Sequence, residues 1–280
     1  MQLVHACRRG GRGGSPTAVL DEIPMSDADR RALPAEYGTS HVVFLAETGP
    51  AAGPAAGAAT GAATGAKIEI GASLRFFTST GELPACGHGT VAALAVLAQR
   101  SGHPDVTATL RSGGRVHHGR ATRNGDLYEA TFDPGPVDLR TPTTAEREAV
   151  LGALGLAGEP SRIASVGRPR MLVQVANRAS LAALTPDQAR LKQACDRYGL
   201  LGCYVYSTPT PGGRAAARMF APSIGVPEDI ANANSTACLA AHLGFPTLAV
   251  DMGDSLGEPA TILASTPGGL RVGGTAFIAP

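Results

Sequence analysis

The chain has 280 residues, and its hydrophobic share of 44% is enough for a proper core in one large or two ordinary domains. A net charge of +1 argues against a broad surface for nucleic acid or an anionic membrane. No apolar run approaches the roughly 20 residues of a membrane span, and the N-terminus lacks an apolar signal core. Five cysteines without a C-x-x-C pair favour reduced thiols, so we expect a cytoplasmic protein.

The first half of the chain is predicted to be rich in strands. Ser26, with Asp29 three residues later, predicts a helix that ends at Gly38. Residues 49–66 contain only Gly, Ala, Pro and Thr, and such side chains cannot offset the entropy of ordering. We interpret this segment as a mobile hairpin insert. Apolar and β-branched runs predict strands at residues 2–6, 17–20, 40–45, 67–70, 74–77, 106–110, 115–121 and 127–132.

Residues 134–136, Pro-Gly-Pro, mark the best domain boundary. They divide an N-terminal half, residues 1–134, from a C-terminal half, residues 135–280, whose last strand can return to the first half. Thr144 is expected to cap a helix that continues to Leu156, and a second helix is expected at residues 186–198. Further strands are predicted at residues 171–175, 202–207, 260–264 and 270–278.

The stretch from residue 75 to residue 102 has a second copy at residues 218–244. The same interval of 143 residues separates Arg75 from Arg218 and Phe77 from Phe220. Each copy places a strand, a chain breaker and an acid before a short apolar helix, which indicates internal duplication. We therefore predict an α+β fold of two pseudo-symmetric domains, each a strongly curved, mostly antiparallel sheet around a central helix.

Small residues where each duplicated helix begins leave its first backbone N–H groups free to bind an anion. In the first copy, Glu82 and His88 lie beside that point. A carboxylate and an imidazole at such a place indicate acid–base chemistry. The expected partner is therefore a small-molecule carboxylate rather than a nucleic acid or a membrane.

Four segments together resemble the phenazine-biosynthesis isomerase (PhzF-like) family. They are GSPTAV at residues 14–19, RFFTSTGELPACGH at 75–88, RMFAPSIGVPED at 218–229 and VGGTA at 272–276. The resemblance covers most of the chain in order, apart from the low-complexity insert. It implies the diaminopimelate epimerase-like fold, a substrate cleft between the two domains, no metal, no organic cofactor and a homodimer.

The resemblance also implies functional residues. Asp229 matches the family's aspartate, which moves a proton along a conjugated system together with a glutamate. His41 stands in the place of that glutamate, in SHVVF at residues 40–44, and an imidazole both takes and gives protons near neutral pH. Asn234 replaces the usual serine and is expected to hydrogen-bond the substrate or its loop.

Each candidate also has a structural interpretation, which the sequence leaves open. Asp229 and His88 could serve only the helix starts, and His41 could be a satisfied histidine at a strand end. Glu82 is as well explained by an ion pair with an arginine as by catalysis. We assign proton transfer to Asp229, His41 and Glu82, and substrate contacts to Ser40, Gly87, His88, Gly89, Asn234 and Ser235.

Cys86 is interpreted as a small core residue. True epimerases of this fold hold two cysteines across the substrate, and Cys86 fits the first position. Ile230 and its neighbour occupy the second position, and Cys238 lies further along the helix. The His117-His118 pair is interpreted as part of a solvated strand face, not a metal site, because no His or Cys partner has suitable spacing.

Three functions are weighed. The first is an isomerase that shifts a proton, and hence a double bond, in a small unsaturated carboxylate of antibiotic metabolism. Isomerases of unsaturated pyrroline carboxylates, which supply alkylproline units of antibiotics such as lincomycin, are the subgroup that the departures suggest. The second is an amino- or imino-acid racemase or epimerase, which the missing second cysteine disfavours. The third is a non-catalytic ligand-binding protein, supported by the absence of a glutamate at His41.

Overall fold

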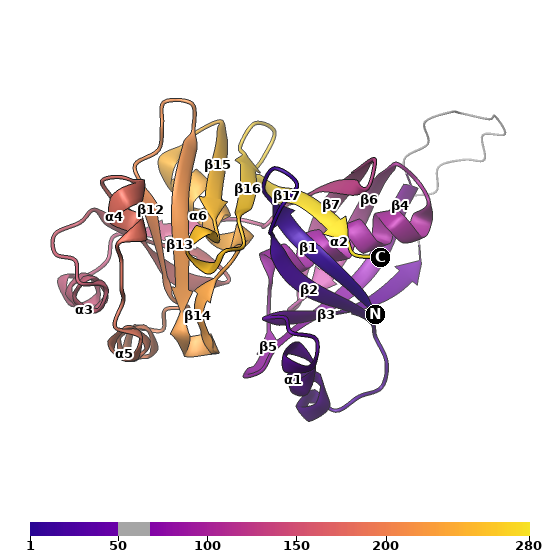
Figure 1. The fold of residues 1–280 in the computed structure, drawn as a ribbon, viewed down its shortest axis with the longest axis horizontal. Coiled ribbons are helices and arrows are strands. Elements are labelled where there is room, and N and C mark those ends of the chain that lie inside the picture. The colour runs from indigo at the N-terminus through magenta and orange to yellow at the C-terminus, as the bar shows by residue number, and fades with distance from the viewer. Residues whose placement is uncertain (50–67) are drawn as a thin grey trace.

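The computed structural model describes residues 1–49 and 68–280, so the insert expected at residues 49–66 falls almost entirely outside the described residues. Figure 1 shows two lobes side by side, the N-terminal half at the right and the C-terminal half at the left. The predicted α+β fold of two pseudo-symmetric halves is confirmed by the strand pairings of each lobe. Within the described part of the chain, no helix is long and apolar enough to cross a membrane.

The sheet of the N-terminal half closes into a barrel. Among the described residues, eight strands each pair with two neighbours in the order β1-β2-β3-β4-β6-β7-β8-β17 and back to β1. Because the barrel is closed, its sheet has no open edge. Helix α2 (Gly87–Ser101) fills the interior of the barrel. The strands are β1 (Gln2–Arg8), β2 (Ser15–Asp21), β3 (His41–Gly49), β4 (Ile68–Thr78), β6 (Asp105–Ser112), β7 (Arg115–Asn124), β8 (Leu127–Phe132) and β17 (Arg271–Ile278), with β5 (Gly81–Leu83) beside β4.

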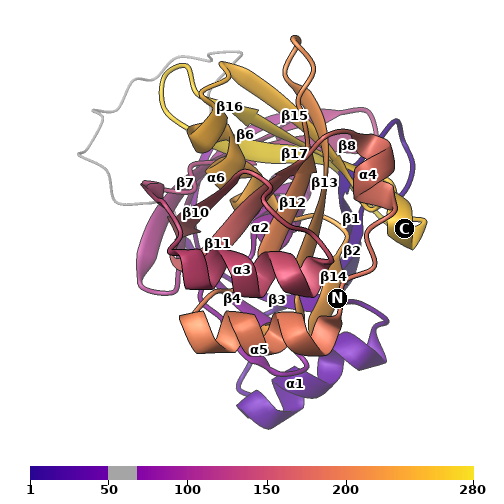
Figure 2. The ribbon, with the colours of Figure 1, turned by 90° about the vertical axis from the view of Figure 1, so that its left-hand side faces the viewer.

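The C-terminal half repeats this plan around α6 (Ala233–Leu243). Its strands pair in the order β9-β10-β11-β12-β13-β15-β16-β17, and β14 pairs with β13. They are β9 (Asp138–Arg140), β10 (Ser161–Val166), β11 (Arg168–Val175), β12 (Cys203–Ser207), β13 (Arg214–Ala221), β14 (Val226–Asp229), β15 (Thr247–Met252) and β16 (Ala260–Ser265). The other helices lie outside the sheets (Figure 2) and are α1 (Asp27–Glu36), α3 (Thr144–Leu154), α4 (Arg178–Ala182), α5 (Gln188–Tyr198) and the short turns η1 (Pro222–Ile224) and η2 (Asp254–Leu256).

The duplication is visible in the ion pairs as well as in the sheets. Arg75 donates to both carboxylate oxygens of Glu82, at 2.9 and 2.7 Å. Arg218 donates to Glu228 with the same two atoms at the same two distances. Such bidentate pairs fix geometry as well as charge. The acid of each copy therefore ties a hairpin to its neighbouring strand.

The core is built around a helix of small residues. Every residue of α2 from Gly87 to Ala98 is buried, which is the pattern of a helix enclosed on all sides. Its alanines let the barrel strands approach, and Gly119 of β7 faces Leu94 directly. A methyl group added at Gly119 would lie 2.6 Å from the Leu94 Cδ2 atom. This contact sets how closely β7 packs on α2.

Most predicted elements are present, with two instructive differences. The strands expected at residues 67–70 and 74–77 belong to one strand, β4, because pairing with β3 and β6 continues through Gly71. Helix α3 is capped by Thr143, not Thr144, because Thr143 and Glu146 form a reciprocal capping box. Strand β17 pairs with β1 and β8 of the first half and with β16 of the second, so it joins the two sheets.

We expect Gly119→Val to lower the free energy of unfolding by about 2 kcal/mol or more, because its side chain would collide with Leu94 in a closed core. Urea unfolding followed by circular dichroism measures this. The matched control is Gly152→Ala in α3, where the nearest atom to an added methyl is the Arg190 side chain at 3.6 Å. The control should stabilise the protein by up to about 1 kcal/mol. Equal effects of the two substitutions would contradict the packing argument.

Candidate active site

The two central helices begin opposite each other. Helix α2 follows Cys86, whose side chain makes no capping bond, and α6 follows Asn232, whose side chain accepts a hydrogen bond from the Ser235 N–H at 2.9 Å. A methyl group added at Gly87 would lie 2.6 Å from the Ala233 Cβ atom, so the two helix starts nearly touch. The positive ends of both helix dipoles therefore converge on one place.

A cavity opens where the helix starts meet. It encloses roughly 940 Å³, counting its open mouth, and residues of both halves line it. Reactive side chains line the cavity close to the helix starts. They include His41 at the beginning of β3, Cys86 and His88 at the start of α2, Asp229 at the end of β14 and Asn234 in α6.

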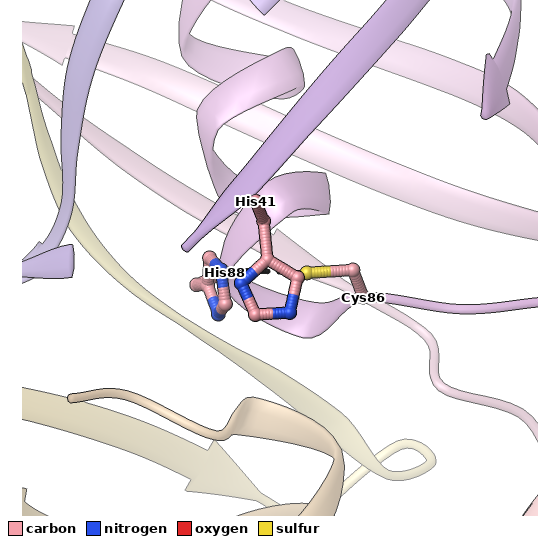
Figure 3. Close-up of side chains that lie close together, drawn as sticks. All are labelled: His41, Cys86 and His88. Atoms are coloured by element: carbon pink, nitrogen blue, oxygen red, sulfur yellow. Dashed lines mark hydrogen bonds between the residues drawn. The ribbon is translucent and has the colours of Figure 1, made fainter. Parts of the chain in front are cut away.

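His88 is the centre of this group (Figure 3). Its Nδ1 donates a hydrogen bond to the Ala231 carbonyl oxygen at 2.9 Å, which links the first half to the second. Its Nε2 lies 3.4 Å from the Cys86 Sγ atom. The His41 ring packs edge-on against the His88 ring, with centroids 4.5 Å apart. Three reactive side chains of the N-terminal half thus meet at one helix start.

The two histidines differ in charge. Burial lowers the pKa of His41 well below its usual value, and the charge of His88 lowers it further. Burial also opposes the charged form of His88, but Cys86, Asp229 and the Ala231 carbonyl outweigh burial and raise the pKa of His88 to about 9. The surroundings thus favour the neutral form of His41 and the charged form of His88.

Asp229 lies on the opposite wall, in the C-terminal half. Burial raises the pKa of its carboxyl group, and the charge of His88 and a 3.0 Å hydrogen bond from the Asn232 amide partly counter this rise. The Ala231 N–H also donates to it at 3.4 Å. A buried carboxyl group with increased proton affinity can both take and return a proton.

The sequence profile of the phenazine biosynthesis-like protein family matches residues 11–265. The chain belongs to this family. It is 27% identical over 239 residues to the uncharacterized isomerase YddE of Salmonella typhimurium, covering 83% of this chain and 74% of that protein. It is 29% identical over 269 residues to the trans-2,3-dihydro-3-hydroxyanthranilate isomerase of Pseudomonas fluorescens, covering 91% and 86%. The resemblance expected from the four sequence segments is thereby confirmed.

Solved structures confirm the diaminopimelate epimerase-like fold. A predicted epimerase from Pseudomonas aeruginosa superposes with a TM-score of 0.78 at 23% identity, covering 100% of this chain and 96% of that chain. A hydroxyproline epimerase from Agrobacterium vitis superposes with a TM-score of 0.55 at 12% identity, covering 99% and 87%. At these identities the likeness concerns the fold alone. The curated relatives are named isomerases, and this member of the phenazine biosynthesis-like family is accordingly an isomerase.

The structure brings most of the predicted site residues together. Both His41 and Asp229, from opposite halves, line the same cavity, and so do Gly87, His88 and Asn234. The sequence order gave no distance between these side chains. Their meeting depends on the two helix starts facing each other.

Glu82 is a correction, because it does not line the cavity. Both of its carboxylate oxygens are taken up by Arg75, which also contacts Asp27 of α1. Its side chain is 41% exposed on the outer surface. Glu82 therefore forms the ion pair with an arginine that the sequence left open, and its position does not fit a role in proton transfer.

Three other predicted substrate contacts are not among the residues that line the cavity. The Ser40 hydroxyl is 2.8 Å from the His41 Nδ1 atom, so it orients that ring. Gly89 packs against Phe76 and Val43, where an added methyl group would lie 3.0 Å from each. Ser235 is fully buried and accepts a hydrogen bond from Arg170. These residues position others.

Sequence reasoning missed several lining residues. Cys86 belongs to the buried core, as predicted, and it also lines the cavity beside His88. His117 was expected to face solvent, but it is buried on the inner face of β7 and donates from Nδ1 to the Asp133 carbonyl oxygen at 2.9 Å. The alternation of a strand, which puts His117 inside and His118 outside, was the available signal. Three arginines of the wall carried no sequence signal, namely Arg115, Arg168 and Arg170.

His41, Cys86 and His88 each offer a possible metal-ligand atom, and these atoms lie within 4.8 Å of one another. Thiolate and imidazole form the ligand type that zinc uses. In the described structure the Nε2 atom of His88 is already in contact with the Cys86 thiol, and its Nδ1 is bonded to Ala231. Both ring nitrogens of His88 thus have a partner within the protein.

The pKa of His88 predicts a pH-dependent contribution to stability. An unfolded histidine titrates near 6.5, whereas the folded pKa of His88 is about 9. Its stabilising contribution is therefore fully present below pH 6.5 and is lost as pH rises towards 9. The destabilisation caused by His88→Asn should therefore shrink steadily as pH rises across this window.

Urea unfolding of the wild type and of His88→Asn at pH 6, 7, 8 and 9 measures this trend. His118→Asn, the same substitution on the exposed face of the barrel, is the matched control. A His88→Asn effect that stays constant from pH 6 to pH 9 would show that His88 is neutral in the folded protein.

Proposed function

We propose that this isomerase moves a proton, and with it a double bond, within a small unsaturated carboxylate, without a metal or an organic cofactor. One observation carries the proposal: a neutral imidazole of the first half and a buried carboxyl group of the second line one cavity at two facing helix starts. A substrate in this cavity can touch both groups. The charged His88 lies beside them.

The substrate carboxylate has a natural place at the helix starts. In α2, the first helical hydrogen bond from a backbone N–H is that of Thr90 to the Cys86 carbonyl, at 2.9 Å. The N–H groups of Gly87, His88 and Gly89 therefore have no partner within the helix, and the N-cap side chain does not cap them. An anion at this point would satisfy them and interact with both helix dipoles.

His41 and Asp229 then share the proton transfer. His41 takes a proton from a C–H bond made acidic by conjugation, the electron pair shifts along the conjugated system, and the protonated carboxyl group of Asp229 gives a proton to the distant carbon. The proton on His41 then returns to Asp229 through water, which restores both groups for the next turnover. One C–H bond breaks and one forms, so the step needs no oxidant or reductant. His88, as a cation at the same helix start, stabilises the negative charge that develops towards the carboxylate.

The substitutions relative to the family point to a specialised substrate. His41 and Asn234 stand in place of the family's glutamate and serine, and both line the cavity. We propose an unsaturated pyrroline carboxylate of an alkylproline antibiotic pathway. A reducing cytoplasm is supported by five buried cysteines, all unpaired, and we propose that the protein acts there as a homodimer.

Two other functions are less well supported. Symmetric epimerisation by two thiols needs a second cysteine across the cavity, but Cys86 is the only thiol among the described lining residues, and Cys238 is buried in α6. A binding protein without catalysis would not need a neutral base and a proton-accepting carboxyl group at one site. Proton transfer between unlike groups fits the observed geometry better.

Deuterium incorporation from D2O into 1-pyrroline-2-carboxylate, followed by NMR, tests the proposed function. The wild type should exchange a C–H proton faster than the uncatalysed reaction, and Asp229→Asn should reduce the enzymatic rate by at least 100-fold, because its amide cannot exchange a proton. His41→Gln should have a similar effect. Asp126→Asn, at an exposed turn of the first half, should leave the rate unchanged. Full activity in Asp229→Asn would exclude the proposed mechanism.

Metal removal provides a separate test. The exchange rate should be unchanged after dialysis against EDTA and should not increase when zinc is returned, because the proposed proton transfers use protein groups alone. Elemental analysis of the dialysed protein confirms removal. A rate that disappears with the metal and returns with it would show that His41, Cys86 and His88 act as a metal site.

A further inference from the structure

We infer that the substrate carries a second acidic group, which binds a wall of three arginines contributed by both halves of the protein. This wall consists of Arg115, Arg168 and Arg170, all of which line the cavity. The inference rests on the proposed function and deepens it, because it makes the substrate a dianion rather than a simple monocarboxylate.

Arg170 is the most deeply buried arginine of the wall. It is 1% exposed, and its guanidinium donates only to neutral oxygens, those of Ser235 at 3.3 Å, Arg168 at 2.8 Å and Val166 at 3.5 Å. Its Nε–H is buried without a partner in the described structure. A buried charge without a counterion costs several kcal/mol, so this arginine calls for an anion.

The groups around Arg170 do not supply that anion. The side chains that favour its charged form are Cys238 and Tyr204, whose own pKa values are raised above normal by burial, so both are neutral at pH 7. No carboxylate within the described ranges lies within ion-pairing distance of Arg170. A ligand in the cavity is the remaining source of negative charge.

The other two arginines approach the wall from opposite halves. Arg168 opens β11, and Arg115 opens β7 of the first half. The Arg115 guanidinium reaches across the cavity to Gly167, where an added methyl group would lie 3.9 Å from its Nη1 atom. Neither side chain forms an ion pair with a carboxylate in the described part of the chain. A bound acid would therefore join both halves through these cations.

The charge balance of the cavity requires more than one acidic group. Among the described lining residues, Asp229 is the only acid, whereas three arginines and the cationic His88 are present. A single carboxylate at the helix starts leaves the arginine wall uncompensated. A second carboxylate or a phosphonate-like group at the far end of the substrate would pair with it in the bidentate manner that guanidinium favours.

Matched probes test this inference by isothermal titration calorimetry. Crotonate carries one carboxylate, glutaconate adds a second at the far end of the same chain, and 4-phosphonocrotonate replaces the second carboxylate by a phosphonate. We expect glutaconate or phosphonocrotonate to bind the wild type at least tenfold more tightly than crotonate, and the preferred probe identifies the acidic group. Equal dissociation constants for all three would overturn the inference.

Variants locate the effect. Arg170→Gln should remove the preference for the dianion, and Arg115→Gln should reduce it at least threefold, while crotonate affinity stays within twofold. Arg115 is exposed, so its variant keeps the test decisive even where Arg170→Gln fails to fold. Arg31→Gln, on the exposed face of α1, is the control and should keep the full preference. A preference that survives both Arg170→Gln and Arg115→Gln would also overturn the inference.

The two proposals can fail independently. Deuterium exchange is measured on the same three probes in D2O. If deuterium exchanges but neither dianion binds more tightly than crotonate, the proposed proton shift is supported and the second acidic group is rejected. If a dianion binds more tightly and Arg115→Gln abolishes this preference, but no unsaturated acid exchanges deuterium, the role of the arginine wall is supported and the proposed isomerisation is rejected.

Discussion

The site depends on two buried helices that begin face to face. Contact between Gly87 and Ala233 brings the positive ends of α2 and α6 together, and the hydrogen bond from His88 to Ala231 joins the halves at the same point. The first N–H groups of α2 have no helical partner there. The fold thus creates a place where an anion is favoured before any catalytic side chain is considered.

The two copies contribute different side chains to the place where the helix starts meet. The first half contributes two histidines and a thiol, and the second contributes a carboxyl group. Burial keeps His41 neutral, while the neighbours of His88 keep it charged, so two identical side chains 4.5 Å apart differ in charge. A proton can therefore leave a substrate towards one half and return from the other.

The histidine at position 41 also changes the charge of the cavity. The family's glutamate would bring a negative charge, whereas a neutral imidazole brings none. With Asp229 as the one acid among the described lining residues, the cavity is rich in cations. The duplicated Arg–Glu pairs outside the cavity show the opposite arrangement, since Arg75 and Arg218 each have a carboxylate partner. These two paired arginines tie hairpins to their neighbouring strands, whereas Arg115, Arg168 and Arg170 line the cavity.

Local pattern in the sequence determined the duplication, most strands and helices and the family, because periodicity, chain breakers and motif spacing are properties of neighbouring residues. It left Glu82 undecided between structure and catalysis, interpreted Cys86 as a small core residue, and placed His117 on a solvated strand face. Only the tertiary structure decided these, since it gives Glu82 to Arg75 and turns Cys86 and His117 into the cavity. The charges of His41 and His88 and the missing counterion of Arg170 were likewise invisible in sequence, because burial and partners distant along the chain set them.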